Sequence, residues 1–217
     1  MGIDDTTRRI GRLLDEEGGR IAVELGLDLD DHQADVDRWF LAATLFGAPI
    51  RASVAKRTWR VLADAGVRTV VDAGERSWDD LVGLLDAGGY GRYDFRTATR
   101  LHELAAVVAQ KYGGSITALA DEPDPESVAK ALQDLPGWGP TTTGVFLREL
   151  RGVWPGADVP VNDRARAAAR QLRIPLGRSS EQRWSLLAEQ ARQADVDPRD
   201  LEAALIRRAV RLRLPTS

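Results

Sequence analysis

Two short segments in the second half of the chain contain the residue types that could bind an anion or support hydrolysis. The first is LPGWG at residues 135–139, which lies between two stretches with helical apolar spacing. Gly137 and Gly139 allow positive φ angles and a close approach of a foreign group to the backbone. A helix that begins at about Pro140 exposes its first amide groups, and these suit a phosphate. The same pattern is also typical of a plain helix–helix turn that binds nothing.

The second segment is VPVND at residues 159–163, which precedes a predicted helix over 164–172. Asp163 carries a carboxylate at the start of this helix, and its neighbour Asn162 carries no charge. Both residue types also cap helices routinely, so a purely structural role stays open.

These segments, together with GYGR at residues 89–92, resemble the helix-hairpin-helix region of the endonuclease III superfamily of DNA glycosylases in order and spacing. The resemblance covers residues 35–175. It implies an enzyme that flips a damaged, mispaired or modified base out of the duplex and hydrolyses its N-glycosidic bond. It also implies backbone contacts that read no sequence. The residues assigned to DNA binding are Leu135, Gly137, Trp138, Gly139, Thr141, Thr142, Arg164 and Arg166.

The chain departs from the family pattern at three places. Thr141 occupies the position of the lysine that forms a Schiff base in bifunctional members, so we expect a monofunctional enzyme. The resemblance implies a catalytic aspartate that stabilises the positive charge developing on the sugar and orients or deprotonates the attacking water. Asn162 occupies the position of that aspartate, so either Asp163 takes the role one residue later or the chain binds DNA without catalysis. The polar residues that fill the gap left by a flipped base are absent. In the corresponding stretch, Leu45 or Phe46 could insert as an apolar wedge between base pairs, and both could equally be core residues.

The loop around residues 89–94 is longer than its counterpart in the family. Its Tyr90, Arg92 and Tyr93 are of the types that stack on or contact an everted base, and an ordinary surface loop is an equal alternative. The chain has no cysteine, which excludes a cysteine-held iron–sulfur cluster, and it has only two histidines. We therefore expect no metal and no cofactor.

Nearly every segment has the apolar spacing of an amphipathic helix, most clearly residues 35–46 and 95–112. Asp124-Pro125 and Asp197-Pro198 are typical helix starts, because aspartate caps the first amides and proline is tolerated at the first helical position. Only scraps such as Thr69-Val70-Val71 are strand-like. The sequence therefore predicts an all-α protein.

We expect two helical lobes. A central helical barrel over residues 45–147 would end in the hairpin, and residues 1–44 and 148–217 would form the second lobe. The leading prediction is a monofunctional, metal-free DNA glycosylase. A catalytically silent helix-hairpin-helix protein that binds DNA is the alternative, and an unrelated helical protein is the third interpretation.

The 30 basic and 33 acidic side chains are distributed unevenly along the 217 residues. Residues 1–134 carry 16 basic against 24 acidic side chains, whereas residues 135–217 carry 14 against 9, and all 14 are arginines. A basic half is typical of a polyanion contact, although a general preference for arginine over lysine is an alternative. No stretch suits a signal peptide or a membrane span. We expect a cytoplasmic monomer whose partner is double-stranded DNA.

Overall fold

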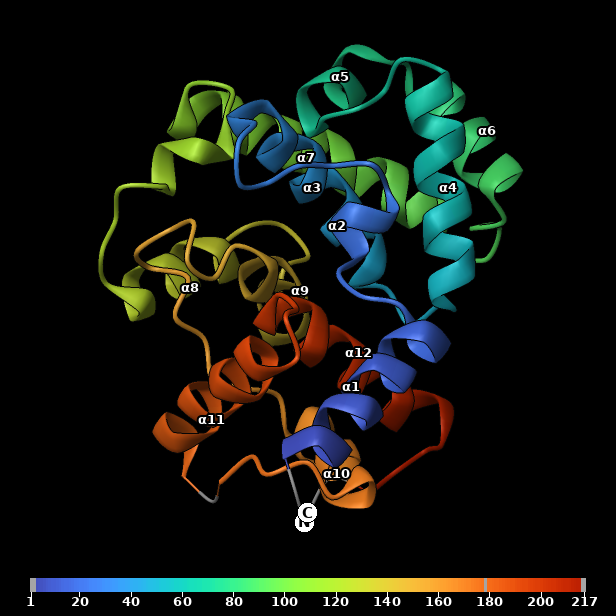
Figure 1. Cartoon of the computed structure of the whole chain (residues 1–217). Coiled ribbons are helices and arrows are strands. Elements are labelled where there is room, and N and C mark those ends of the chain that lie inside the picture. Colours follow the sequence, from blue (N-terminus) through green and yellow to red (C-terminus); the bar gives the residue numbers. More distant parts are fainter. Residues whose placement is uncertain (1–2, 178, 216–217) are drawn as a thin grey trace. The chain divides into compact units, whose positions relative to one another are not determined.

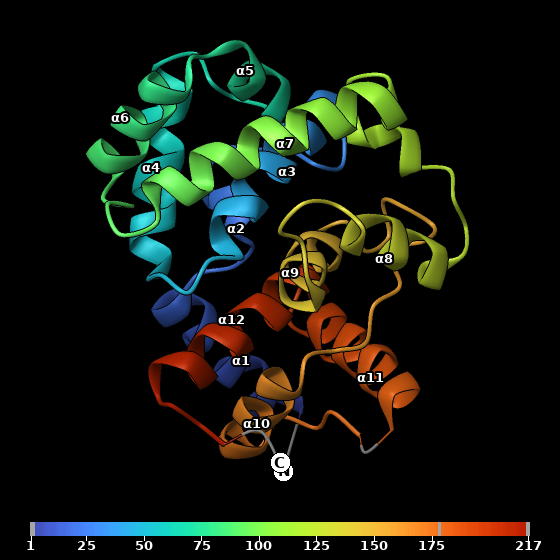
Figure 2. The same cartoon turned by 180° about the vertical axis from the view of Figure 1, so that it is seen from behind.

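The computed structural model describes residues 3–177 and 179–215, and within these ranges the chain is helical without a strand (Figure 1 and Figure 2). The all-α prediction is confirmed. The helices are α1 (Ile3–Glu17), α2 (Ile21–Glu24), α3 (Gln33–Phe46), α4 (Ala52–Asp64), α5 (Val70–Glu75), α6 (Trp78–Gly88), α7 (Asp94–Tyr112), the 3₁₀ helix η1 (Ile116–Leu119), α8 (Pro125–Gln133), α9 (Pro140–Glu149), α10 (Asp163–Leu172), α11 (Ser180–Gln193) and α12 (Pro198–Arg211).

The chain divides into two compact units. The terminal unit combines Met1–Glu24 with Val159–Ser217, and the central unit is Leu25–Asp158. These boundaries differ from those expected at residues 45 and 147. The first boundary lies earlier because α3 packs against α4, α5 and α9 and therefore belongs to the central unit. The second lies later because the central unit continues beyond α9 to Asp158.

The core of the terminal unit forms where α12 packs against α10, α1 and α11. α10 contributes mainly alanines to this core, and their small side chains let the helices approach closely. Larger aliphatic side chains from α1 and α12 fill the remaining space, as close packing requires. The core includes Ile10, Leu13, Val161, Ala165, Ala168, Ala169, Leu187, Leu201 and Leu205.

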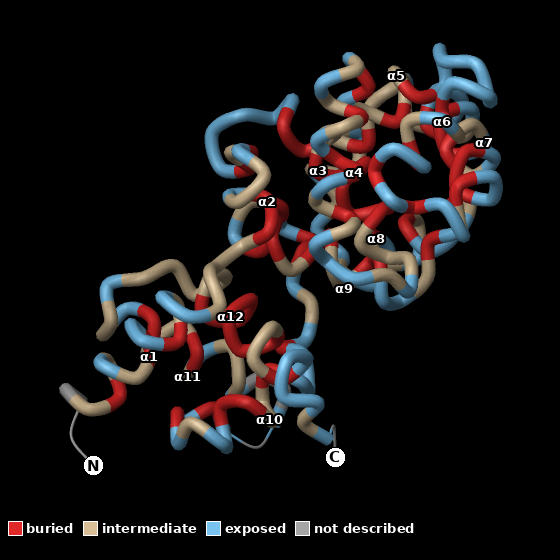
Figure 3. The backbone as a smooth tube through the Cα atoms, turned by 90° about the vertical axis from the view of Figure 1, so that its right-hand side faces the viewer, coloured by how far each residue is buried: buried red, intermediate tan, exposed pale blue. Residues whose placement is uncertain are grey.

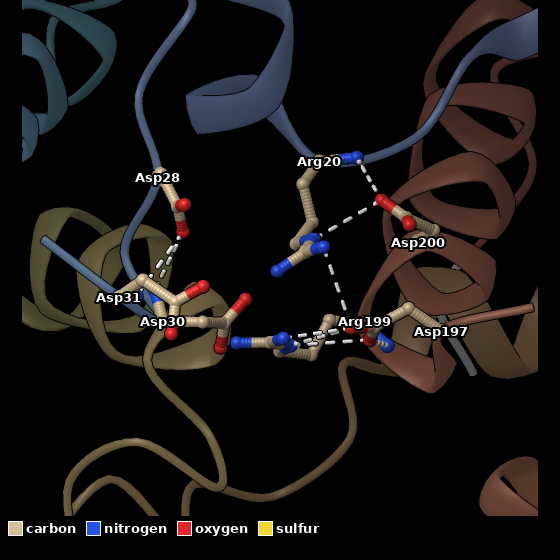
Figure 4. Close-up of polar contacts among 7 residues, drawn as sticks. All are labelled: Arg20, Asp28, Asp30, Asp31, Asp197, Arg199 and Asp200. Atoms are coloured by element: carbon tan, nitrogen blue, oxygen red, sulfur yellow. Dashed lines mark hydrogen bonds and ion pairs between the residues drawn. The ribbon is translucent and has the colours of Figure 1, made fainter.

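Ion pairs in the terminal unit join the segment after α1 to the start of α12 (Figure 4). The backbone N–H of Arg20 donates to Asp200 Oδ1 at 2.7 Å, and its guanidinium lies 3.4 Å from Asp197 Oδ2. Arg199 Nη2 donates to the same Asp197 oxygen at 2.7 Å. Burial alone raises the pKa of Asp197, but hydrogen bonds from Arg199 and the charges of Arg199 and Arg20 outweigh burial and lower it.

An aromatic cluster forms the centre of the central unit, where α9 packs against α3. The Phe40 and Trp138 rings stack with centroids 4.4 Å apart, and Phe146 meets both rings edge-on. The indole N–H of Trp39 donates to the Phe146 carbonyl at 3.1 Å. Figure 3 shows buried positions along these helices. The segment that connects α8 to α9 is thereby attached to a rigid core.

Several helices begin at the predicted signals. Asp124 and Asp197 each accept a hydrogen bond from a backbone N–H in the first turn of the following helix. The strand-like Thr69–Val71 stretch is instead the start of α5. Thr69 Oγ1 accepts from the Asp72 N–H, and the Asp72 carboxylate accepts from the Thr69 N–H. This reciprocal capping box outweighs the β preference of the two valines.

Candidate nucleic-acid interface

The turn between α8 and α9 depends on a glycine at position 137. Gly137 has φ +74°, a left-handed conformation that residues with a side chain rarely adopt. The next residue, Trp138, donates its backbone N–H to the Leu135 carbonyl at 3.0 Å and closes the turn. A β-carbon at Gly137 would also lie 1.9 Å from Nε of Arg100. The backbone conformation therefore favours glycine, and a side chain here would also have to displace the Arg100 guanidinium.

Gly139 has a different role from Gly137. Its φ of −125° and ψ of −177° are open to any residue, and a β-carbon there would meet no atom within 4 Å. Gly139 therefore does not use the positive φ that a glycine allows, whereas Gly137 does. Gly139 is the N-cap of α9 and supplies no capping side chain, and Pro140 follows as the first helical residue. The Thr141 and Thr142 amides have no intrahelical acceptor at this end.

A pocket of about 370 Å³ lies beside the turn, entirely within the central unit. Its walls come from the α3–α4 connection, the first turns of α7 and the start of α9. Arg96 and Arg100 line it, and no acidic residue does. Within the described part of the chain, neither arginine has an ion-pair partner. The lining residues are Gly47, Ala48, Pro49, Tyr93, Arg96, Thr97, Arg100, Gly137, Gly139, Pro140, Thr141 and Thr142.

The pocket combines two sources of positive potential. The N-terminus of α9 carries the positive end of a helix dipole and amide groups without partners. The two guanidinium groups add full charges, and arginine binds phosphate oxygens through two parallel hydrogen bonds. Thr141 is exposed, whereas Thr142 is buried against the α3–α4 connection, where Gly47 leaves room for its hydroxyl. This arrangement can hold an anionic group.

Two residues assigned to DNA binding instead anchor the turn. Leu135 and Trp138 are 3 % and 4 % exposed, so they cannot lie on a contact surface. The Trp138 ring stacks on Phe40, and its indole N–H donates to Thr44 Oγ1 at 3.1 Å. The prediction of direct contact is therefore replaced by a structural role for both residues.

The residues predicted to contact the flipped base, as wedge or pocket, differ in how far they are buried. Leu45 is fully buried. Tyr90 is also buried, and its hydroxyl donates to the Leu45 carbonyl at 2.5 Å. Both are core residues, which corrects their assignment to the base. Burial raises the pKa of the Tyr90 phenol, so it stays neutral. Phe46 is half-buried with its ring 6.4 Å from that of Trp39.

The remaining candidates of the loop before α7 are accessible. Arg92 is exposed, and the half-buried Tyr93 lines the pocket. Arg96 and Arg100 belong to the same site and are not among the residues predicted from the sequence. Their spacing of four residues on a predicted helix places them on one face, and this signal could have identified them.

Asn162 and Asp163 lie at the start of α10, in the terminal unit. Asn162 is the N-cap and accepts the Arg164 N–H at 2.9 Å, while its own N–H donates to Glu202 Oε1 at 3.1 Å. The Asp163 side chain is 59 % exposed.

Two arginines accompany Asp163. Nη1 of Arg183 lies 3.0 Å from Asp163 Oδ1, and Nε of Arg166 lies 3.9 Å from the same atom. The Arg164 side chain is exposed, so of the two arginines assigned to DNA it is the more accessible. The first turn of α10 therefore holds one carboxylate within a basic surrounding.

Among the described residues, no helix is long and apolar enough to cross a membrane. In the same residues, no three acidic or histidine side chains gather as a metal site would require. Comparison with models of known protein families and with curated proteins finds no match to the chain.

Proposed function

We propose that the chain binds double-stranded DNA through the α8–α9 turn and hydrolyses the N-glycosidic bond of a damaged, mispaired or modified base. The observation that supports binding is the pocket beside the turn, with Arg96, Arg100 and the start of α9 in its walls. A phosphodiester is the anion that matches these groups, because amides and guanidinium groups both donate to phosphate oxygens. Such contacts position a duplex without reading its sequence.

The proposed reaction follows from the resemblance to the endonuclease III superfamily. The bond between C1′ of the deoxyribose and the base nitrogen breaks, and the base leaves with the bonding electrons. A water oxygen then bonds to C1′, and its proton is released. Asp163 would stabilise the positively charged sugar and accept that proton. Thr141 replaces the Schiff-base lysine, so the product would be an intact strand with an abasic site.

A catalytically silent DNA-binding protein is the second candidate, and a specific observation favours it. The amide of Asn162 is engaged in capping α10, and the carboxylate of Asp163 is within 3.0 Å of Arg183. The positive charge of an arginine in this position offsets the attraction of the carboxylate for a developing cation. In this interpretation, α10 provides only a phosphate contact through Arg164.

Incubation with a panel of duplexes, each with one altered base, tests the two candidates. Alkali treatment cleaves abasic strands, so the glycosylase proposal predicts a cleaved product from at least one duplex after alkali and none before. The Asp163→Asn variant should bind that duplex and form no product. Binding to every duplex without any product would contradict the glycosylase and favour the silent protein. Absence of binding at low salt would overturn both.

A further inference from the structure

Two aromatic rings of the central unit lie together on its surface. Trp78 and Phe95 are 40 % and 61 % exposed, and every other tryptophan and phenylalanine of the chain is buried or half-buried. Their rings stack with centroids 5.4 Å apart and an angle of 16° between the planes. Neither ring is needed to fill the core. The pair therefore presents apolar surface to solvent at a substantial cost.

The two rings are held in place by polar contacts. The indole N–H of Trp78 donates to Thr99 Oγ1 at 3.1 Å, and the Thr99 hydroxyl donates to the Phe95 carbonyl at 3.0 Å. Each ring also stands in the first turn of its helix. Ser77 caps α6, and the Asp94 carboxylate accepts the Phe95 N–H at 2.6 Å. A ring with fixed orientation loses little entropy when it stacks on a partner.

The charges around the pair are arranged unevenly. Arg92 and Arg96 flank Phe95 in the chain, both are exposed, and neither has an ion-pair partner among the described residues. Asp79 and Asp80 follow Trp78 and carry the opposite charge. A partner that carries both phosphate groups and a flat apolar group matches this combination of arginines and exposed rings. Phosphates would lie on the arginine side, and the flat group would lie over the rings.

We propose that the Trp78–Phe95 pair stacks against an unpaired base of the DNA whose backbone occupies the pocket beside the α8–α9 turn. The inference rests on the proposed function and narrows its substrate class to DNA with a base outside the helix. Arg96 lines the pocket and is the residue after Phe95, so one nucleic acid can reach both sites. Every base has a flat π face, so the stacking is independent of sequence.

Fluorescence anisotropy tests this with three labelled oligonucleotides: a matched duplex, the same duplex with one bulged thymine, and the single strand. The unmodified chain should bind the bulged duplex more tightly than the matched one. Phe95→Ala should weaken binding to the bulged duplex on the order of 10-fold, a typical loss for one stacked base. Phe95→Tyr keeps an aromatic face and should bind like the unmodified chain. Val210→Ala, at a 52 % exposed site of the terminal unit, is the matched control and should change nothing.

The outcomes separate the two proposals. Binding of all three oligonucleotides with equal affinity by the unmodified chain and by Phe95→Ala would overturn the stacking inference and leave the proposed function intact. No binding by the unmodified chain would overturn both. Sedimentation velocity of the same samples shows whether the pair instead contacts a second copy. Self-association that Phe95→Ala abolishes, with DNA affinity unchanged, would also overturn the inference. Far-UV circular dichroism should show that each variant is folded.

Discussion

Asp163 Oδ1 lies 3.0 Å from Nη1 of Arg183, so the carboxylate at the start of α10 is already next to a cation. The two residues are twenty positions apart, and they meet because α11 packs in the same unit as α10. The neighbouring Asn162 is committed to capping. These contacts set two interpretations against each other: a catalytic Asp163 and a purely structural one.

Single substitutions of Asp163 and of Asn162 distinguish these two interpretations. If Asp163 is catalytic, Asp163→Asn should remove nearly all base release, because a neutral amide neither stabilises a cation nor accepts a proton. Binding of the same duplex should persist or tighten, because a charge that repels phosphate is gone. Release of the free base, measured by chromatography, reports the activity.

Asn162→Asp is the matched variant, because aspartate caps a helix as well as asparagine does. In a silent protein, this change should create activity by restoring the family's aspartate. In an active enzyme it should impair activity near neutral pH, because two adjacent carboxylates raise one pKa. Base release that neither substitution changes would contradict both assignments.

The two glycines of the α8–α9 turn should respond differently to substitution. Gly137→Ala places a side chain in a left-handed conformation and displaces Arg100, so the free energy of unfolding should fall by at least about 1 kcal/mol. Gly139→Ser fits the extended backbone and adds a capping hydroxyl, so stability should rise by about 0.3 kcal/mol or stay constant. Urea denaturation measures both values.

The Gly139→Ser variant also tests the anion site. The serine hydroxyl would accept a hydrogen bond from a backbone N–H in the first turn of α9, and that N–H would no longer be available to a phosphate. DNA affinity should therefore fall although the protein is as stable as before. A stable Gly139→Ser protein with unchanged affinity would exclude the α9 amides from DNA binding.

The local features of the fold were predictable from the sequence. The helix starts at Asp124-Pro125 and Asp197-Pro198 are where the capping signals indicate, because a cap depends only on neighbouring residues. Thr69 is the exception, because the two valines after it favour a strand whereas its reciprocal hydrogen bonds with Asp72 favour the helix that forms. Local signals in conflict need the surrounding structure to decide between them.

The candidate site was predictable only in part. The spacing of LPGWG identifies the turn, but it does not reveal that Trp138 points into the core and stacks on Phe40. Burial of Tyr90 and exposure of Phe95 are likewise invisible to periodicity, since both depend on how α6 and α7 pack. The sequence can therefore propose residue types for a site, whereas tertiary packing decides which of them are accessible.

Acid should destabilise the terminal unit through Asp197. Its pKa in the folded protein lies below the unfolded value, so its contribution to stability is complete above the unfolded value of about 3.9. That contribution is lost as the pH falls through the folded pKa. Asp197→Asn should lower the melting temperature at pH 7 and reduce its dependence on pH in the acid range. Equal acid dependence in both proteins would contradict a lowered pKa.

The product of base release should be an intact abasic strand. Thr141 cannot form a Schiff base, so borohydride should trap no covalent complex between the protein and DNA. Denaturing gel electrophoresis detects such a complex directly. Trapping that disappears on replacement of Lys56, Lys111 or Lys130 would show a bifunctional enzyme and contradict the proposed class.

The central claim is that the pocket with Arg96 and Arg100 holds the phosphodiester backbone, and the salt dependence of duplex affinity tests it most directly. Log affinity should fall linearly with log salt between about 50 and 200 mM, independent of sequence. The Arg96→Ala/Arg100→Ala double variant should bind more weakly and reduce the slope by about 2, one for each lost phosphate contact. Arg68→Ala, at an exposed site between α4 and α5, should leave the slope unchanged. The same slope for the double variant and the unmodified chain would contradict the claim.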